Sequence, residues 1–471
     1  MPYGAPTPYS GTTYANLASS RARTSGALLP ALPGDLPGAL RRSGDALSHR
    51  RARPLMARRR AAGAPQTRPL AGDGWGPEKH ATAEEKSYLE GMAMDKVRIG
   101  VVGTGGMGQG HCDYMNKLDV GQLTAVCDIV PTVAQEIGRK HGVPHFVNHT
   151  DLLDSGLVDA ILIATPHYYH PPIAIDAFKR GIHVLSEKPI GVSVKAAGEM
   201  IRAAEKSGKV FAVMFQMRAL PEYQAAKKLL ADGRVGELVR ASMILAMYRS
   251  QAYYDSGGWR ATWKGEGGGV LLNQAPHGFD AFTWLVGLPK YVSAQTRTRL
   301  HDIEVEDEAA AMVEFDNGAH GYIYAGVIEA PQVDRIEIVG DRGKIQFDEN
   351  GLRFWELDTP ISEFTRTSKE MWAAPRGRLV DVPLEKRETG HIAITRNFCR
   401  AILYDEPLLS PGAEGIRSLE LANAMILSSY KKERVRLPIK RNEYEELLAK
   451  LRRTSKPKRV ARDRRITDTR F

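Results

Sequence analysis

The feature that most constrains the fold is a glycine-rich turn, GTGGMG at 103–108, that directly follows the β-branched run VRIGVV. A GxGxxG pattern between a strand and a helix permits a tight turn and lets a pyrophosphate approach the helix N-terminus, where unpaired N–H groups favour an anion. A turn that only packs helix on strand is the alternative. The residues we expect to hold a dinucleotide here are Gly103, Thr104, Gly105, Gly106, Met107 and Gly108.

A carboxylate follows the next apolar run, QLTAVC. Asp128 stands 20 residues after Gly108, where it can accept hydrogen bonds from both hydroxyls of a ribose. Ile129 comes next, and no Arg or Lys directly follows to neutralise a 2′-phosphate. The sequence therefore predicts NAD as cofactor rather than NADP.

Strand-length apolar runs alternate with helical stretches from Lys96 to about residue 216. This alternation predicts βαβ units and a doubly wound parallel sheet, an NAD-binding Rossmann-type domain at 94–216. Beyond residue 236 the apolar runs are longer and are joined by turns such as DNG (316–318). That pattern predicts an α+β domain at 217–440 with a mainly antiparallel sheet, a helix at 270–286, and closing helices at 391–403 and 413–432.

The net charge of +10 belongs to the two ends of the chain. Residues 1–91 carry 13 Lys and Arg against 7 Asp and Glu, residues 450–471 carry 10 against 2, and the segment between them is net −4. We therefore expect solvated basic ends and no specific nucleic-acid partner. The Ala/Pro/Arg-rich stretch 1–91 shows no strand or helix period and is predicted to be disordered. Residues 441–471 are predicted to form a basic tail, whose polar run from residue 450 is expected to be mobile.

The N-terminal stretch, the apolar windows and the cysteines together indicate the cellular compartment. An organellar transit peptide is an alternative reading of the N-terminal stretch, but Asp35, Asp45 and Asp73 interrupt it, and we expect translation to start at Met92 or Met94. No apolar window is long enough to span a membrane. Three cysteines without a CxxC pair indicate reduced, buried thiols and a cytoplasmic protein.

A second glycine run introduces polar residues at helical spacing. The stretch GEGGGVLLNQAPHGFD (265–280) places Asn273, His277 and Asp280 on one face of the predicted helix. His277, with an ordinary pKa of about 6.5, is interpreted as a proton acceptor, and a satisfied core histidine is the alternative. Two further polar motifs follow predicted parallel strands, where ligands of such sheets bind: Thr165, Pro166 and His170, and then Glu187 and Lys188.

Taken together, these motifs resemble the Gfo/Idh/MocA family of nicotinamide-dependent sugar and cyclitol oxidoreductases. The resemblance covers residues 96 to about 440 and includes the EKP triplet at 187–189, Arg218 after VMFQM, and WRATW at 259–263. It implies catalytic roles for Lys188 and His277, a cofactor contact for Arg218, and homo-dimer or homo-tetramer contacts. Where the family usually has an aspartate, this chain has Asn273, which we also place in the catalytic set.

The implied reaction is the oxidation of a hydroxyl group, with His277 accepting its proton and Lys188 polarising its oxygen. Tyr254, Trp259, Arg260 and Asp280 are the expected substrate contacts; the aromatic residues could equally be core. His141, His145 and His149 have metal-ligand spacing, but Gly142 and Pro144 break that helix, so we expect no metal. Glycoside cleavage through transient oxidation and a non-catalytic NAD-binding regulator remain alternative functions.

Overall fold

The computed structural model describes residues 96–456. The stretch predicted to be disordered, 1–91, and the last part of the predicted basic tail, 457–471, lie outside the described residues.

The first sheet of the described part has six strands in the order β3-β2-β1-β4-β5-β6, and all neighbouring strands are parallel. The predicted doubly wound parallel sheet is confirmed. Val102 pairs with both Cys127 and Ile163, so these three strands end at the same edge of the sheet. The strands are β1 (Val97–Val102), β2 (Gly121–Cys127), β3 (His145–Phe146), β4 (Ala160–Ile163), β5 (His183–Ser186) and β6 (Phe211–Val213).

Helices connect these strands and carry ordinary start and stop signals. Pro131 opens one helix, Ser193 caps another by accepting from the Ala196 N–H, and Gly142 and Gly208 close helices in the left-handed conformation. Because α3 ends at His141, the three histidines 141, 145 and 149 do not share a helix. The helices are α2 (Gly106–Met115), α3 (Pro131–His141), α4 (His149–Asp154), α5 (His170–Lys179), α6 (Val194–Ser207) and the short η1 (His167–Tyr169).

The second sheet of the described residues has nine strands in the order β14-β13-β12-β11-β7-β10-β9-β8-β15. Every neighbouring pair is antiparallel except β10 and β7, so the prediction of a mainly antiparallel sheet is confirmed. The strands are β7 (Leu238–Tyr248), β8 (Tyr291–Arg297), β9 (Glu308–Glu314), β10 (His320–Gly326), β11 (Ile328–Gly340), β12 (Gly343–Asp348), β13 (Gly351–Leu357), β14 (Gly377–Val380) and β15 (Val435–Arg436).

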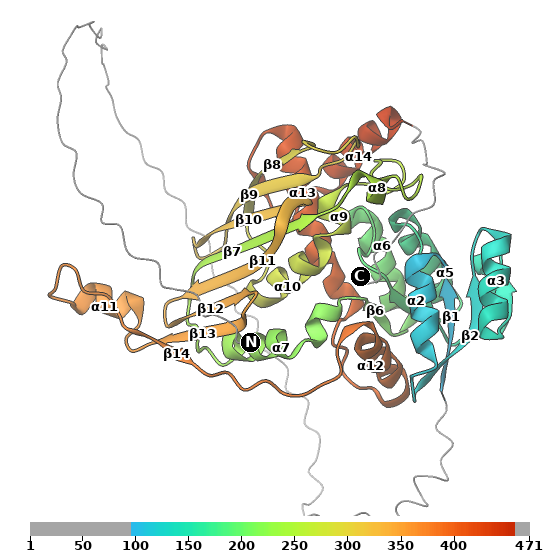
Figure 1. Cartoon of the computed structure of the whole chain (residues 1–471), viewed down its shortest axis with the longest axis horizontal. Helices are drawn as coiled ribbons and strands as arrows, with labels where there is room; N and C mark the ends of the chain where they lie inside the picture. Colours follow the sequence, from blue (N-terminus) through green and yellow to red (C-terminus); the bar gives the residue numbers. More distant parts are fainter. Residues whose placement is uncertain (1–95, 457–471) are drawn as a thin grey trace, which may run out of the picture. The chain divides into compact units, whose positions relative to one another are not determined.

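Two helices, α10 and α13, pack together beside this second sheet, α10 against β7 and α13 against β8 (Figure 1). Alternate strand residues such as Ala241, Met243 and Leu245 are buried, which is the period expected for a sheet covered on one face. With α10 and α13 included, the helices between β6 and the final helix are α7 (Pro221–Ala231), α8 (Gln251–Tyr254), α9 (Val270–Asn273), α10 (Pro276–Val286), α11 (Ile361–Thr367), α12 (Gly390–Tyr404), α13 (Ile416–Lys431), η2 (Gln216–Ala219) and η3 (Gly412–Gly415).

The single helix predicted at 270–286 is wrong. It is two helices, α9 and α10, because Pro276 lacks an N–H and begins a new helix at its first turn. Asn273 therefore does not share a helix face with His277 and Asp280, which do lie on α10 one turn apart.

The basic tail predicted at 441–471 is wrong for its first part, which forms α14 (Arg441–Thr454). Tyr444, Leu447, Leu448 and Leu451 recur at the spacing of one helix face, and this face packs against α6 and α13. Because most other residues of this helix are charged, its overall composition does not reveal the apolar face.

α12 returns to the first sheet and contacts α2, β1 and β5. Cys112, Cys127 and Cys399 are free and buried, as predicted. No helix within residues 96–456 is both long and apolar enough to cross a bilayer.

Candidate active site

The glycine turn has the shape that a pyrophosphate requires. Gly103 has φ +89°, and a Cβ there would lie 2.8 Å from the carbonyl of Ala164 on the neighbouring strand. A Cβ on Gly108 would collide with the Gly103 carbonyl oxygen, so only glycine lets helix and turn approach so closely. Gly105 and Gly106 are exposed and have open space around them at the N-terminus of α2. The turn therefore fits an anionic dinucleotide.

Asp128 is fixed beside this turn. One carboxylate oxygen accepts from the Thr104 N–H at 2.8 Å, and the other accepts from the Val130 N–H at 2.9 Å. Ile129 beside it is largely exposed and carries no charge. A carboxylate held at the end of β2 fits a ribose whose hydroxyls are both free, as in NAD.

The polar residues predicted after β4 and β5 form hydrogen bonds that fix the backbone of the two loops. His170 is buried, with its Nδ1 2.8 Å from the Pro189 carbonyl oxygen and its Nε2 2.7 Å from the Thr165 carbonyl oxygen. Burial lowers the pKa of His170, and a neutral ring donates only one of these hydrogen bonds. His170 thereby ties the loop after β4, with Thr165 and Pro166, to the loop after β5.

Glu187 is also buried, and its Oε1 lies 2.7 Å from His111 Nε2 on α2. Burial alone would raise the pKa of Glu187, but the hydrogen bond and the charge of His111 outweigh it and hold the pKa at about 2. His111 in turn contacts Tyr114, whose hydroxyl contacts Thr395 on α12. The geometry favours a structural role for Glu187 and His170 over direct cofactor contacts.

A cavity of about 380 Å³ brings the two predicted catalytic side chains together. Lys188, from the loop after β5, and His277, from the first turn of α10, both line it. The lining residues that the argument below uses are Lys188, Gln216, Tyr253, Asn273, Gln274 and His277.

The two side chains differ in charge. Lys188 Nζ donates a hydrogen bond to the backbone carbonyl of Asn273 at 2.8 Å, and burial lowers its pKa, against the opposing charges of Glu187 and Glu266. Burial, with a smaller contribution from Lys188, lowers the pKa of His277 to about 3. His277 is therefore neutral at physiological pH, with its lone pair available, and is less basic than the ordinary pKa of about 6.5 assumed from sequence.

Three polar side-chain atoms at this cavity lack a hydrogen-bond partner among the described residues. They are the side-chain oxygens of Gln216 and Gln274 and the Nδ1 atom of His277, and all three are buried. The Gln216 amide donates to His277 Nε2 at 3.3 Å, and the Gln274 amide donates to the Tyr253 hydroxyl at 3.2 Å. In the neutral ring of His277, Nε2 accepts from Gln216, so Nδ1 carries the proton and is an unpaired donor. Because buried polar atoms are nearly always paired, the two glutamine oxygens and this donor indicate a ligand with both hydrogen-bond donors and acceptors, as a hydroxyl group has.

Asn273 lines the same cavity, and its side-chain amide donates to a buried carboxylate, Glu266. The amide of Asn273 is thus already engaged with the protein. The carboxylate of Glu266, from the second glycine run, thus lies next to Asn273, although Glu266 itself does not line the cavity.

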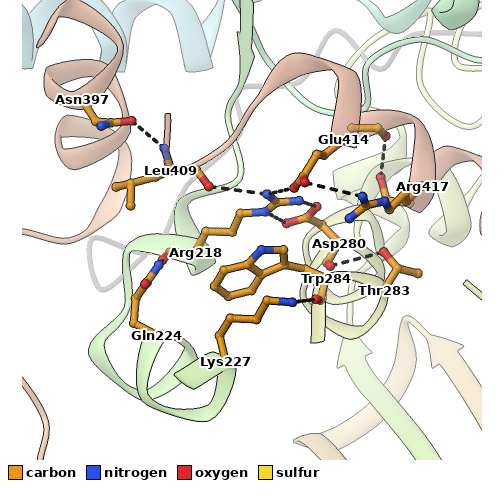
Figure 2. Close-up of polar contacts among 12 residues, drawn as sticks. Arg218, Gln224, Lys227, Asp280, Thr283, Trp284, Asn397, Leu409, Glu414 and Arg417 are labelled. Carbon is orange, nitrogen blue, oxygen red and sulfur yellow. Dashed lines mark hydrogen bonds and ion pairs between the residues drawn. The ribbon is translucent and has the colours of Figure 1, made fainter. Parts of the chain in front are cut away.

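Arg218 and Asp280 lie outside the cavity lining and bind each other (Figure 2). Arg218 Nε and Nη2 donate to the two oxygens of Asp280 at 2.8 and 2.7 Å, and Nη1 contacts Glu414 at 2.5 Å. Both members of the pair are buried, and the guanidinium lies over the Trp284 ring. The geometry favours a structural role for both residues over the expected cofactor and substrate contacts, because their polar atoms are occupied.

The aromatic residues expected to contact the substrate, Tyr254 and Trp259, do not themselves line the cavity. Tyr254 is buried and packs against Tyr253 and His301, whereas Tyr253 lines the cavity. Arg260 lies between the rings of Tyr253 and Trp259, 4.6 and 4.7 Å from their centroids, and donates to the Tyr253 hydroxyl at 2.7 Å. Arg260 and Trp259 thus support Tyr253 at the cavity wall.

Sequence reasoning missed Gln216, Gln274 and Arg249, which line the cavity, and it considered Tyr253 only as part of an aromatic cluster from which Tyr254 was chosen. Gln216 lies inside the quoted VMFQM, Gln274 directly follows Asn273, and Tyr253 stands next to Tyr254. The signal was present as polar or aromatic neighbours of the chosen residues, but which neighbour faces the cavity depends on the backbone path.

Two family models match the chain. "Oxidoreductase family, NAD-binding Rossmann fold" matches residues 97–215, and "GFO/IDH/MocA C-terminal domain" matches residues 223–346. The chain belongs to the Gfo/Idh/MocA family. The predicted family, the NAD-binding domain and the oxidoreductase class are therefore confirmed.

Relatives of known name agree with this assignment. An inositol 2-dehydrogenase of Rubrobacter xylanophilus is 27% identical over 341 residues, 71% of this chain and 91% of that protein. One from Arthrobacter sp. is 31% identical over 271 residues, 53% of this chain and 75% of that protein. The crystal structure of the WlbA dehydrogenase from Bordetella pertussis, in complex with NADH and UDP-GlcNAcA, matches with a TM-score of 0.64 and 29% identity, over 73% of this chain and 100% of that one.

Proposed function

We propose that the protein oxidises a hydroxyl group of a sugar, a sugar derivative or a cyclitol, with NAD as the hydride acceptor. The observation that carries this proposal is the cavity in which the Lys188 ammonium and the neutral His277 imidazole lie with two unpaired acceptors, the side-chain oxygens of Gln216 and Gln274. A polyol supplies several hydroxyl donors to such acceptors, and an apolar or carbonyl compound does not. The relatives named for inositol oxidation and for a sugar nucleotide complex point to the same substrate class.

The cofactor fits the glycine turn and Asp128. Gly105 and Gly106 would face its pyrophosphate, Gly103 and Gly108 would keep the turn close to the sheet and to α2, and Asp128 would bind its adenosine ribose. When bound, NAD supplies an acceptor for the hydride that leaves the substrate carbon.

The chain's own residues manage the proton and the charge. His277 accepts the hydroxyl proton in its neutral form, but an imidazole of such low pKa is a weak base on its own. Lys188 compensates, because an ammonium held by the Asn273 carbonyl stabilises the negative charge that develops on the substrate oxygen. The two residues are therefore expected to act together.

A panel of polyols, sugars, sugar nucleotides and glycosides tests the reaction, read by the absorbance of reduced nicotinamide. Net NADH formation with a polyol or sugar supports the proposal. Cleavage of a glycoside without net NADH would favour the transient-oxidation alternative. NAD binding without turnover of any compound, in a protein whose Lys188→Ala variant behaves the same, would favour the regulator.

We also propose that the protein is a homo-oligomer that uses the sheet face opposite α10 and α13. Met312 and Tyr322 are paired neighbours on β9 and β10, and their exposed fractions are 55% and 39%. Adjacent exposed apolar side chains on a sheet face are typical of a subunit interface. Light scattering of the wild type and of Met312→Glu tests this: a monomeric wild type would contradict it.

A further inference from the structure

Glu266 is a buried carboxylate beside the cavity, in the second glycine run. Only 1% of its surface is exposed. Its Oε2 accepts from the Ala261 N–H at 2.5 Å, and its Oε1 accepts from the side-chain amide of Asn273. Burying a carboxylate is costly, so a retained one needs an explanation from its partners.

Its partners lead to the reacting end of the cavity. Asn273 donates its amide to Glu266, and the backbone carbonyl of the same residue accepts from Lys188 Nζ at 2.8 Å. One residue thus connects a carboxylate to an ammonium. Glu266 and Lys188 also interact directly through their charges.

Glu306, a second buried glutamate nearby, is bound by backbone groups alone. Glu306 accepts from the Gly269 and Leu271 N–H groups at 2.8 and 3.2 Å, so it caps the start of α9 through backbone atoms. Glu266 differs because one of its two oxygens is given to a side chain that lines the cavity.

We infer that Glu266 is a positioning residue of the reaction, whose carboxylate fixes Asn273 and, through it and through its own charge, keeps the Lys188 ammonium in place and charged. This inference rests on the proposed role of Lys188 in polarising the substrate oxygen. Removing the charge would leave Lys188 more easily deprotonated and its carbonyl partner less firmly held.

The charge of Glu266 is expected to change within the working pH range. Burial raises its pKa to about 7, opposed by the Ala261 hydrogen bond and by Arg260, Asn273 and Lys188. The other groups that face it are His167, which contacts its backbone carbonyl, and Tyr254 and Glu306, which interact with its charge. Because the pKa is raised, the carboxylate is present above about pH 7 and is lost as the pH falls below it.

The first experiment needs neither cofactor nor turnover. A small amine-reactive label is applied to the full chain across a pH series, and labelling of Lys188 is followed by peptide mass spectrometry. The pH of half-maximal rate reports the pKa of Lys188, and the plateau reports access of the reagent. Glu266→Gln is expected to lower that pKa and to raise labelling at pH 8 by about three- to tenfold, since one pKa unit is tenfold.

The matched control is Glu420→Gln. Glu420 is also buried with a pKa raised by burial, and it accepts from the Ile439 N–H at 2.6 Å, but Ile439, unlike Asn273, does not line the cavity. Its variant is expected to leave Lys188 labelling at the wild-type value. Glu266→Asp, which withdraws the carboxylate by one methylene, is measured in parallel and should give an intermediate value. A wild-type Lys188 pKa in folded Glu266→Gln would overturn the inference.

The second experiment uses a substrate found with the polyol panel. Wild-type kcat/KM is expected to rise through a pKa near 7, and Glu266→Gln should lose that inflection together with about 10- to 100-fold in kcat, with a smaller change in KM. Retention of the inflection in Glu266→Gln would assign it to another group. If the wild type oxidises no polyol, the proposed function fails, whereas the labelling experiment still decides the link between Glu266 and Lys188.

Discussion

His277 and Asp280 lie one turn apart on α10, with Asp280 fully buried and His277 half-buried at the cavity, and their surroundings differ in kind. Both oxygens of Asp280 are bound by Arg218, whose remaining nitrogen contacts Glu414 (Figure 2). His277 Nδ1 has no partner among the described residues, and the neighbouring Gln216 oxygen has none either.

The difference separates a structural polar cluster from a binding site. A buried bidentate ion pair in which each carboxylate oxygen has a partner stabilises one packing of α10 and η2 and needs no ligand to complete it. Unpaired buried polar atoms are tolerated only where something else completes them. Hydrogen-bond satisfaction, rather than residue type, therefore identifies which polar residues of this helix face the chemistry.

The largest expected effect is on turnover, through Lys188 and His277 at the cavity. Lys188→Ala and His277→Ala should each lower kcat by about 10²- to 10⁴-fold, since each removes either charge stabilisation or the proton acceptor. NAD affinity, measured by calorimetric titration, should stay close to the wild-type value. Near-normal turnover in either variant would exclude that residue from the chemistry.

The next largest expected effect is on the free energy of unfolding, through the Arg218–Asp280 ion pair. Asp280→Asn should lower the free energy of unfolding by about 3 kcal/mol, because it leaves a buried guanidinium with only Glu414 as a charged partner. Denaturant titration measures this, and kcat of the folded variant should change by no more than a few fold. A loss of turnover as large as that of His277→Ala, without loss of stability, would instead make Asp280 a substrate contact, as the sequence suggested.

The smallest expected effect concerns a single hydrogen bond to substrate. Gln274→Ala should raise KM about fivefold, corresponding to about 1 kcal/mol, with little change in kcat. The matched control is Thr283→Val, since the Thr283 hydroxyl donates within α10 to the Phe279 carbonyl at 2.7 Å. Equal KM values for these two variants would mean that the unpaired oxygen of Gln274 does not contact the substrate.

The sequence was sufficient where function depends on local backbone geometry. The glycine turn, Asp128 after β2 and Lys188 after β5 could be placed because glycine spacing and strand alternation act over a few residues, and the parallel sheet then brings strand ends to one edge. The same local reasoning failed at 270–286, where Pro276 divides the helix, and at α14, where a four-residue apolar stripe is hidden among charges.

What the sequence determined by itself was the family, the two sheets and the side chains able to move a proton or stabilise an anion. Only the tertiary structure decided which polar groups are already paired: Arg218 with Asp280, Glu187 with His111, and Asn273 with Glu266. The physical reason is that each of these contacts joins segments whose separation in space is fixed by packing, and a buried polar atom is either completed by such a contact or left for a ligand.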